Sequence, residues 1–249
     1  MKILQLVRDN AGRPPAPINL TRNATEATIY VYDAIFPDFG VNALGVIDAL
    51  ASLEGVETLN VRINSPGGSV FEGRAIMAAL REFKGKTVAH VDSLCASAAT
   101  SVALACDEVV MSDGAFFMIH NAHGFAYGDK TELRHSADTM EKVEGAIVDD
   151  YVKKTGKTEE DVRALMQAET WFSAKEALEN GFVDSIAKTD KKLKNTWNLA
   201  AFGNAPAALK EPPPDPEPAP VKNETEPAPE AGFFMSAANA NRLRIAQIA

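Results

Sequence analysis

A strand that runs directly into a helix is the feature that most limits what this chain can fold into. Residues 88–100 read Val-Ala-His-Val-Asp-Ser-Leu-Cys-Ala-Ser-Ala-Ala-Thr, so an apolar strand gives way to small residues typical of a buried helix. Ser97 lies at the point of change. A hydroxyl there can act as a nucleophile at a sharp turn, or it can simply cap the helix. Taken alone, the stretch favours the capping role.

Strand and helix patterns alternate on both sides of this junction. Alternation of this kind predicts an α/β domain with parallel strand pairing. The strand patterns lie at 27–33, 56–63, 87–91, 107–111 and 114–119, and helical spacing of apolar residues lies at 41–53 and 70–83.

Residues 129–155 form a long, charged stretch with a broken apolar stripe, which predicts one long helix. Such a helix can project from the domain and pack on a second copy of the chain, or it can lie on its own sheet. The sequence leaves both arrangements open. Two shorter helices are expected after it, the second opened by a capping box at Ser173 and Glu176.

The composition changes after about residue 188. Residues 211–230 hold eight of the 14 prolines, interleaved with acids, which is typical of an extended, disordered segment. We therefore expect four parts. They are an N-terminal segment at 1–26, a folded domain at 27–190, a disordered Pro- and acid-rich linker at 191–232, and a short tail with a helical pattern at 233–249.

Charge and cysteine content exclude several classes of protein. The formal net charge of −9 argues against nucleic acid or an anionic membrane as a partner. Cys95 and Cys106 both lie in apolar sequence and are expected to be buried free thiols. No Cys and His cluster has metal-ligand spacing, so we expect no metal and no cofactor. No signal peptide or membrane span is recognisable, and a cytoplasmic protein is expected.

Serine-type acyl transfer needs a hydroxyl, a base, an acid that orients the base, and backbone N–H donors for the oxyanion. Ser97 is the candidate nucleophile. His120, at the end of a strand, and His123, three residues later, are the candidate bases. The Asn-Ser-Pro-Gly-Gly run at 64–68 is either an ordinary turn or, together with Ala98, the source of the oxyanion donors, with Gly68 supplying one N–H.

Residues 27–187 resemble the ClpP family of serine peptidases, and within it the phage and prophage head-maturation (prohead) proteases. The resemblance rests on four motifs, which are Ile-Asn-Ser-Pro-Gly-Gly at 63–68, Ala-Ser-Ala at 96–98, Met-Ile-His at 118–120, and Trp-Phe-Ser-Ala-Lys-Glu-Ala at 171–177 followed by Gly-Phe-Val-Asp-Ser at 181–185. It implies a ClpP/crotonase-like ββα superhelix, with the helix at 129–155 protruding as a handle that joins stacked, usually heptameric rings.

The resemblance also implies site residues. Ser97 would be the nucleophile and His120 the general base, with activity falling below about pH 6–7 as the imidazole becomes charged. Glu169 stands where the family has an aspartate, and Asp184 is a weaker candidate for that role. Gly68 and Ala98 would form the oxyanion hole.

Three further positions, Gly67, Val70 and His123, fall where the family binds substrate. Two positions depart from the family pattern before the nucleophile. Ser93 replaces a glycine and Cys95 replaces a small residue. The match at 96–98 nevertheless favours Ser97 over Ser93 as the nucleophile.

The implied function is that of a serine endopeptidase that cleaves capsid or scaffold proteins, and itself, during phage head maturation in the host cytoplasm or inside the prohead. The N-terminal segment has no clear match to the loops that engage an unfoldase, so we expect activity without an ATPase. Two alternatives stay open. One is a ring-forming assembly protein with an idle site, and the other is a crotonase-like acyl-CoA enzyme.

Overall fold

The computed structural model describes residues 18–188, 199 and 202–206. Contacts divide the chain into two units, Met1–Pro213 and Pro214–Ala249, and every described residue belongs to the first. The expected tail at 233–249 lies outside the described residues. The elements in chain order are β1 (Asn19–Arg22), β2 (Glu26–Val31), α2 (Ala43–Ala51), β3 (Thr58–Ser65), α3 (Val70–Arg81), β4 (Lys86–Ala96), α4 (Ala98–Ala103), β5 (Glu108–Ser112), β6 (Phe116–Ile119), α5 (Lys130–Thr155), α6 (Glu159–Gln167), β7 (Thr170–Ser173), α7 (Ala174–Glu179) and β8 (Ser185–Ala187).

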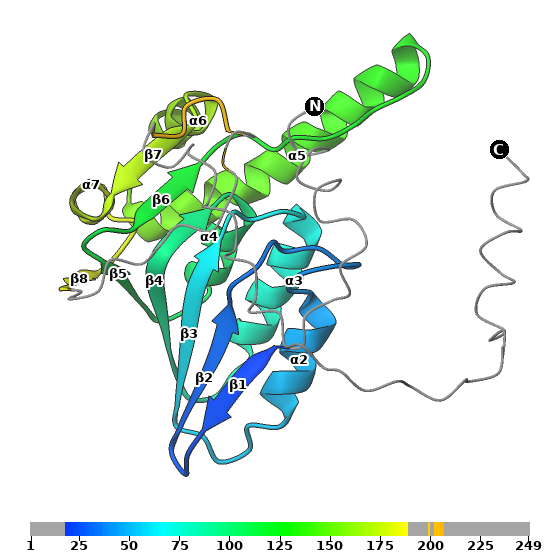
Figure 1. Ribbon diagram of the computed structural model, residues 1–249. Helices are drawn as coiled ribbons and strands as arrows, with labels where there is room; N and C mark the ends of the chain where they lie inside the picture. The colour runs from blue at the N-terminus through cyan, green and yellow to red at the C-terminus, as the bar shows by residue number, and fades with distance from the viewer. Residues whose placement is uncertain (1–17, 189–198, 200–201, 207–249) are drawn as a thin grey trace, which may run out of the picture. The chain divides into compact units, whose positions relative to one another are not determined.

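The sheet branches at β4. The strand order is β1-β2-β3-β4-β5-β8, while β6 pairs with β4 and β7 (Figure 1). The first part of β4, Val88 to Val91, pairs with β5, and its last part, Leu94 to Ala96, pairs with β6. The pairs β2–β3, β3–β4, β4–β5 and β4–β6 are all parallel. Because β4 has 11 residues, its first part can pair with β5 and its last part with β6. It ends directly before Ser97 and α4.

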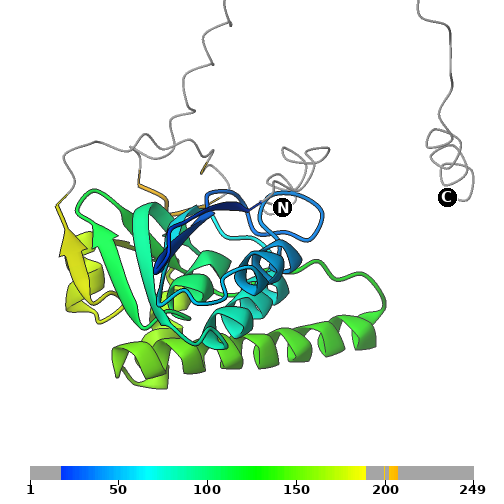
Figure 2. The ribbon, with the colours of Figure 1, turned by 90° about the horizontal axis from the view of Figure 1, so that it is seen from below.

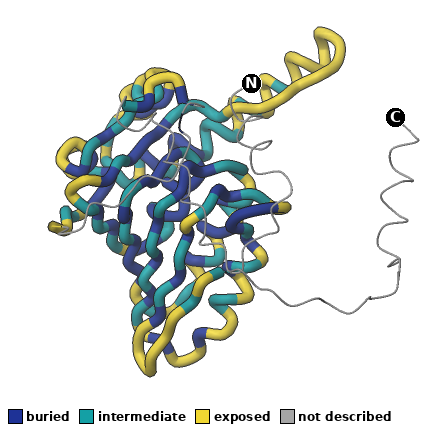
Figure 3. Tube along the Cα trace, viewed as in Figure 1, coloured by how far each residue is buried: buried dark blue, intermediate teal, exposed yellow. Residues whose placement is uncertain are grey.

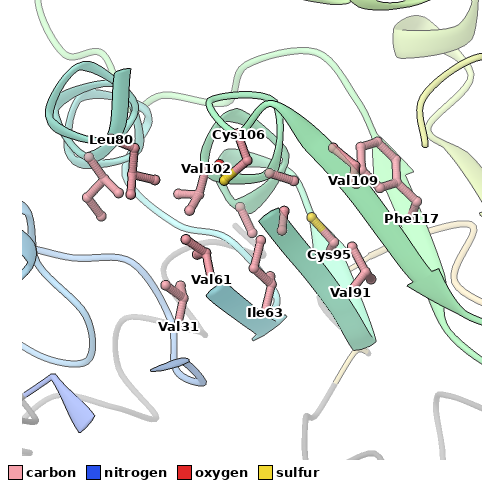
Figure 4. Packing of buried hydrophobic residues seen from close by; sticks show 14 of the residues in the cluster. Val31, Val61, Ile63, Leu80, Val91, Cys95, Val102, Cys106, Val109 and Phe117 are labelled. Carbon is pink, nitrogen blue, oxygen red and sulfur yellow. Dashed lines mark hydrogen bonds between the residues drawn. The ribbon is translucent and has the colours of Figure 1, made fainter. Parts of the chain in front are cut away.

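Burial alternates along the strands, because successive side chains point to opposite faces of the sheet. Along β3, every second residue is buried. In Figures 1 and 2 the helices α2, α3 and α4 lie on one side of this sheet, and apolar residues from strands and helices form the large core on that side. A close view of its packing shows Cys95 and Cys106 among aliphatic side chains (Figure 4). Both cysteines are free and buried, as the sequence predicts.

A second apolar cluster forms on the opposite face of the branched sheet. Leu94 and Ala96 alternate with Cys95 along β4, so they point away from the main core. They pack with Met118 of β6 and with three residues that follow β8 in the chain, Leu199, Phe202 and Ala205. The expectation of a disordered linker at 191–232 is therefore wrong for Leu199, Phe202 and Ala205, because these residues are buried against an apolar face of the sheet.

The two halves of the long helix α5 differ in how they lie against the domain. Its N-terminal half is mostly exposed and runs beyond the rest of the described domain (Figures 2 and 3). Its C-terminal half buries Ile147, Val148 and Tyr151 in the main core. Asp150 ties this half to α3 through Arg74, at 2.9 Å, and Arg81, at 3.3 Å.

Local signals set most element boundaries. Side chains of Asn42, Ser69, Asp129, Thr158 and Ser173 accept hydrogen bonds from the first turns of α2, α3, α5, α6 and α7. The structure differs from the expectation at the start of the domain, because β1 pairs antiparallel with β2 and so belongs to the sheet. It also extends β4 to Ala96 and adds β7 and β8, which are only four and three residues long.

Two kinds of feature are absent from the described residues. Across 18–188, 199 and 202–206, no helix is long and apolar enough to cross a membrane. Within the same part of the chain, no group of three or more His, Cys, Asp and Glu side chains is placed to hold a metal ion.

Phe182 tests the account of the main core. It is fully buried, and the centroid of its ring lies 4.9 Å from that of Phe172 and 5.4 Å from that of Phe117. Phe182→Ala should lower the free energy of unfolding by about 3–5 kcal/mol, because it removes a ring and leaves a cavity. Phe71→Ala is the matched control, since Phe71 is 71% exposed. Urea unfolding followed by circular dichroism measures both, and equal effects would contradict this packing.

Candidate active site

Ser97 occupies a strained turn between β4 and α4. Its backbone has φ 53° and ψ −125°, a region that residues other than glycine rarely adopt. Two elements hold it there. Its N–H donates to the Met118 carbonyl at 2.9 Å, and its carbonyl accepts from the Thr100 N–H at 2.9 Å. The Ser97 hydroxyl makes no capping hydrogen bond to α4, so the capping role that the stretch alone favours is wrong.

His120 meets this hydroxyl because β4 and β6 end side by side. The parallel register places Ala96 opposite Met118, so the residues that follow both strands emerge at one edge of the sheet. His120 Nε2 lies 2.7 Å from Ser97 Oγ. A neutral imidazole in this position can accept the hydroxyl proton, which is the contact that an activated serine needs.

The surroundings of His120 keep its ring neutral. Burial lowers the pKa of His120 to about 4, with a further lowering from His123 and an opposing effect from Glu169. The ring of His123 lies edge-on to that of His120, with the centroids 4.6 Å apart. This corrects the expectation that the imidazole would charge near pH 6–7, because desolvation outweighs the attraction of the carboxylate.

Nδ1 of His120, the atom that an orienting acid would hold, has no hydrogen-bond partner among the described residues. Glu169 is close enough to affect the imidazole electrostatically, yet it is not hydrogen-bonded to it. Its carboxylate accepts from the Trp171 indole at 3.3 Å and from the backbone N–H groups of Gly203 and Asn204 at 3.2 and 2.7 Å. Like Ser97, Glu169 has a positive φ, of 49°.

Asp184 has a different set of partners. It accepts from the Val109 N–H at 2.7 Å and from Lys154 Nζ at 2.6 Å. These contacts join β5, α5 and the segment before β8. Asp184 is therefore engaged in connecting these elements, and the structure does not bring it to His120.

The glycine turn after β3 packs directly against Ser97. A Cβ on Gly67 would lie 2.9 Å from Ser97 Cβ and 2.8 Å from Ala98 N, and Gly67 has φ +83°. Gly68, at φ +150°, is bridged to Ile35, whose carbonyl a Cβ would strike. Ala98 is the first residue of α4, where a backbone N–H has no acceptor within the helix. The turn thus packs against the backbone of Ser97 and Ala98.

A small cavity of about 30 Å³ opens beside Ser97 and His120. Two residues expected at the substrate groove, Val70 and His123, line it, together with Gly68 and Ala98. Tyr151 also lines it, with its hydroxyl 2.6 Å from Thr100 Oγ1. Sequence reasoning missed Tyr151 as a site residue, because it counts there only as part of the apolar stripe of the long helix.

The other two histidines and Ser93 lie away from this contact. His90 Nε2 is 2.9 Å from Asn60 Oδ1 on the middle strands, and His135 is exposed on the projecting half of α5. Ser93 lies within β4 rather than at its end.

Comparison with known proteins agrees with this geometry. The family model described as Clp protease matches residues 20–190. The chain belongs to the Clp protease family. This family assigns the chain to the serine-type peptidases.

Individual relatives match about half of the chain. The chain is 29% identical over 138 residues to the ATP-dependent Clp protease proteolytic subunit 1 of Protochlamydia amoebophila, covering 54% of this chain and 67% of the relative. It is 33% identical over 128 residues to the subunit of the same name from Chlamydia muridarum, covering 50% and 67%. Among solved structures, a mutant of ClpP1 from Listeria monocytogenes matches with a TM-score of 0.58 and 23% identity, over 66% of this chain and 92% of that one, which shows the shared fold.

Gly67 tests the close packing behind Ser97. Gly67→Ala should lower the free energy of unfolding by about 1–2 kcal/mol for the positive φ and by about 1–3 kcal/mol more for the clash. Gly55→Ala is the matched control, since Gly55 has φ +79° and open space around it, so only the first cost applies. Urea unfolding of both variants measures the difference, and equal losses would contradict the contact with Ser97.

The pKa of His120 can be measured directly by NMR titration of the imidazole. We expect a value near 4 in the full chain. His123→Gln should raise the pKa of His120, because it removes a neighbouring ring that disfavours a second positive charge. His135→Gln, on the exposed helix, is the control and should leave it unchanged. A His120 pKa near its ordinary value in the unmodified chain would contradict the burial described here.

Proposed function

We propose that this protein is a serine endopeptidase in which Ser97 is the nucleophile and His120 the general base. The observation that carries the proposal is the contact of 2.7 Å between Ser97 Oγ and His120 Nε2 at a strained strand-to-helix turn. Membership of the Clp protease family supports the same chemistry. Polypeptides are the proposed substrates.

The proposed reaction follows from the positions of these groups. His120 Nε2 takes the Ser97 proton as Oγ attacks the peptide carbonyl, and the Gly68 and Ala98 N–H groups hold the oxyanion. His120 then gives the proton to the leaving amine, and water hydrolyses the acyl-enzyme. Glu169 is the proposed acid of the triad, which would hold Nδ1–H and stabilise the imidazolium. Val70, Gly67 and His123 would line the substrate site.

We further propose that the chain acts on capsid or scaffold proteins, and on itself, during phage head maturation. The resemblance of its motifs to prohead proteases and the Pro- and acid-rich sequence at 211–230 support this role. The host cytoplasm or the prohead interior would be its location. The relatives above are named as ATP-dependent, whereas for this chain we propose activity without an ATPase.

The proposed assembly is a homo-oligomer of stacked, heptameric rings. The N-terminal half of α5 supports it, because most of its side chains are exposed and it extends beyond the rest of the described domain. In a stacked assembly it would pack against a second copy.

Ser97→Ala should abolish hydrolysis of casein or a fluorogenic peptide, with a loss of about a thousandfold or more, because no other hydroxyl contacts His120 Nε2 among the described residues. A fluorophosphonate probe should label the unmodified chain and not this variant. Ser93→Ala is the matched control and should keep both activities. Labelling that persists in Ser97→Ala would contradict the assignment.

Co-expression with candidate head proteins tests the finer role. Intact mass measurement should show trimming of a head protein, or of the chain itself, with the unmodified protein and not with Ser97→Ala. Identical masses in both would favour a ring-forming assembly protein with an idle site. A crotonase-like acyl-CoA enzyme would instead turn over acyl-CoA without needing Ser97.

A further inference from the structure

The residues beyond the peptidase-like region that the structure describes, Leu199 and 202–206, form what we call the docking segment. It covers the face of the sheet opposite the main core. Leu199, Phe202 and Ala205 are 1%, 9% and 5% exposed. They pack on Leu94, Ala96 and Met118, with Phe116 and Trp171 at the margin of the cluster. Burial of this extent means that the segment occupies a specific apolar surface beside the active site.

The docking segment also binds the proposed acid of the triad. The backbone N–H groups of Gly203 and Asn204 donate to the two oxygens of Glu169, at 3.2 and 2.7 Å. The side-chain amide of Asn204 donates to the Ala168 carbonyl at 2.8 Å, so the segment is also hydrogen-bonded to the residue before Glu169. Hydrogen bonds to a carboxylate are among the stronger ones in proteins, and these fix where the Glu169 oxygens point.

The same segment touches the base. The ring of Phe202 lies edge-on to His120, with the centroids 5.8 Å apart, and edge-on to Trp171 at 5.6 Å. Phe202 therefore adds to the burial of an imidazole whose Nδ1 has no partner among the described residues. One short segment contacts both groups that a working triad must join to each other.

We propose that the docking segment is an autoinhibitory latch, which holds Glu169 on its own backbone N–H groups and away from His120 Nδ1 until the segment is displaced. This inference rests on the proposed roles of Ser97, His120 and Glu169. Displacement removes two donors from the carboxylate and leaves it with the Trp171 indole, so the carboxylate can turn to His120 Nδ1, which has no partner among the described residues. Glu169 is thereby free to orient the imidazole and to stabilise its protonated form.

The chemistry of the base explains why the latched state is slow. An imidazole with a pKa near 4 is a weak proton acceptor at neutral pH, and a general base works best with a pKa near the working pH. The titratable groups that face His120 are His123, on the loop after β6, and Glu169, on the turn before β7. Tyr151, on α5, lines the same cavity, and burial raises the pKa of its hydroxyl. Of these, only Glu169 can stabilise the imidazolium.

The test compares three full-length proteins. One is the unmodified chain, the second is the released variant Phe202→Ala with Asn204→Ala, and the third adds Glu169→Gln to the released variant. The two substitutions remove the Phe202 ring that packs on His120 and the Asn204 amide that donates to the Ala168 carbonyl. They leave Ser97, His120 and Glu169 unchanged. Leu44→Ala, at an exposed position of α2, is the control for a lost apolar side chain. Circular dichroism checks that all variants are folded.

Two measurements are made on each protein. NMR titration should show the pKa of His120 raised by about one to three pH units in the released variant, because an opposite charge now pairs with the ring. The value for kcat/KM on a fluorogenic peptide at pH 7 should rise about tenfold or more. Adding Glu169→Gln should remove the rise in kcat/KM and most of the rise in pKa, leaving only the part caused by the lost burial under the Phe202 ring. Leu44→Ala should match the unmodified chain in both measurements.

Each outcome decides for or against the latch. A kcat/KM that falls or stays level in the released variant would overturn it, as would a pKa of His120 that does not rise or that rises equally when Glu169→Gln is present. The NMR readout needs no catalysis, so the two proposals can fail separately. If no protein shows Ser97-dependent hydrolysis but the Glu169-dependent rise in pKa is present, the proposed peptidase function is wrong while the control of Glu169 by the docking segment stands.

Discussion

The hydrogen bond from the Ser97 N–H to the Met118 carbonyl is the contact on which the candidate site depends. It forms only because β4 exchanges its neighbour part-way along, leaving β5 and pairing with β6 near its end. That exchange carries Ser97 to the same sheet edge as His120. It also holds Ser97 at a positive φ, a conformation that persists where surrounding contacts over-determine it.

Two opposing influences act on His120. Burial disfavours a positive charge on the ring, while the nearby carboxylate of Glu169 favours it, and burial is the larger effect. The carboxylate has taken up donors from Trp171, Gly203 and Asn204 instead of the imidazole. The carboxylate that we propose as the acid of the triad is therefore directed to partners other than His120.

Much of this arrangement can be predicted from the sequence by local rules. Capping residues such as Ser173 and Asp129 mark helix starts whatever the rest of the fold does, and apolar periodicity marks the longer elements. The strand-end positions of Ser97 and His120 follow from the same patterns. Short strands such as β1 and β8 were not predicted, because three or four residues carry too little periodic signal and are stabilised mainly by their neighbours.

By itself, then, the sequence determined the α/β alternation, the positions of Ser97 and His120 at the ends of two strands, and the long helix. Only the tertiary structure decided that Ser97 does not cap α4, that the two halves of α5 differ in burial, and where the Glu169 carboxylate points. The physical reason is range. Caps and periodicity act within a few residues, whereas Glu169 is bound by residues 34 and 35 positions away, and Phe202 is buried by a sheet face whose strands are distant in the chain.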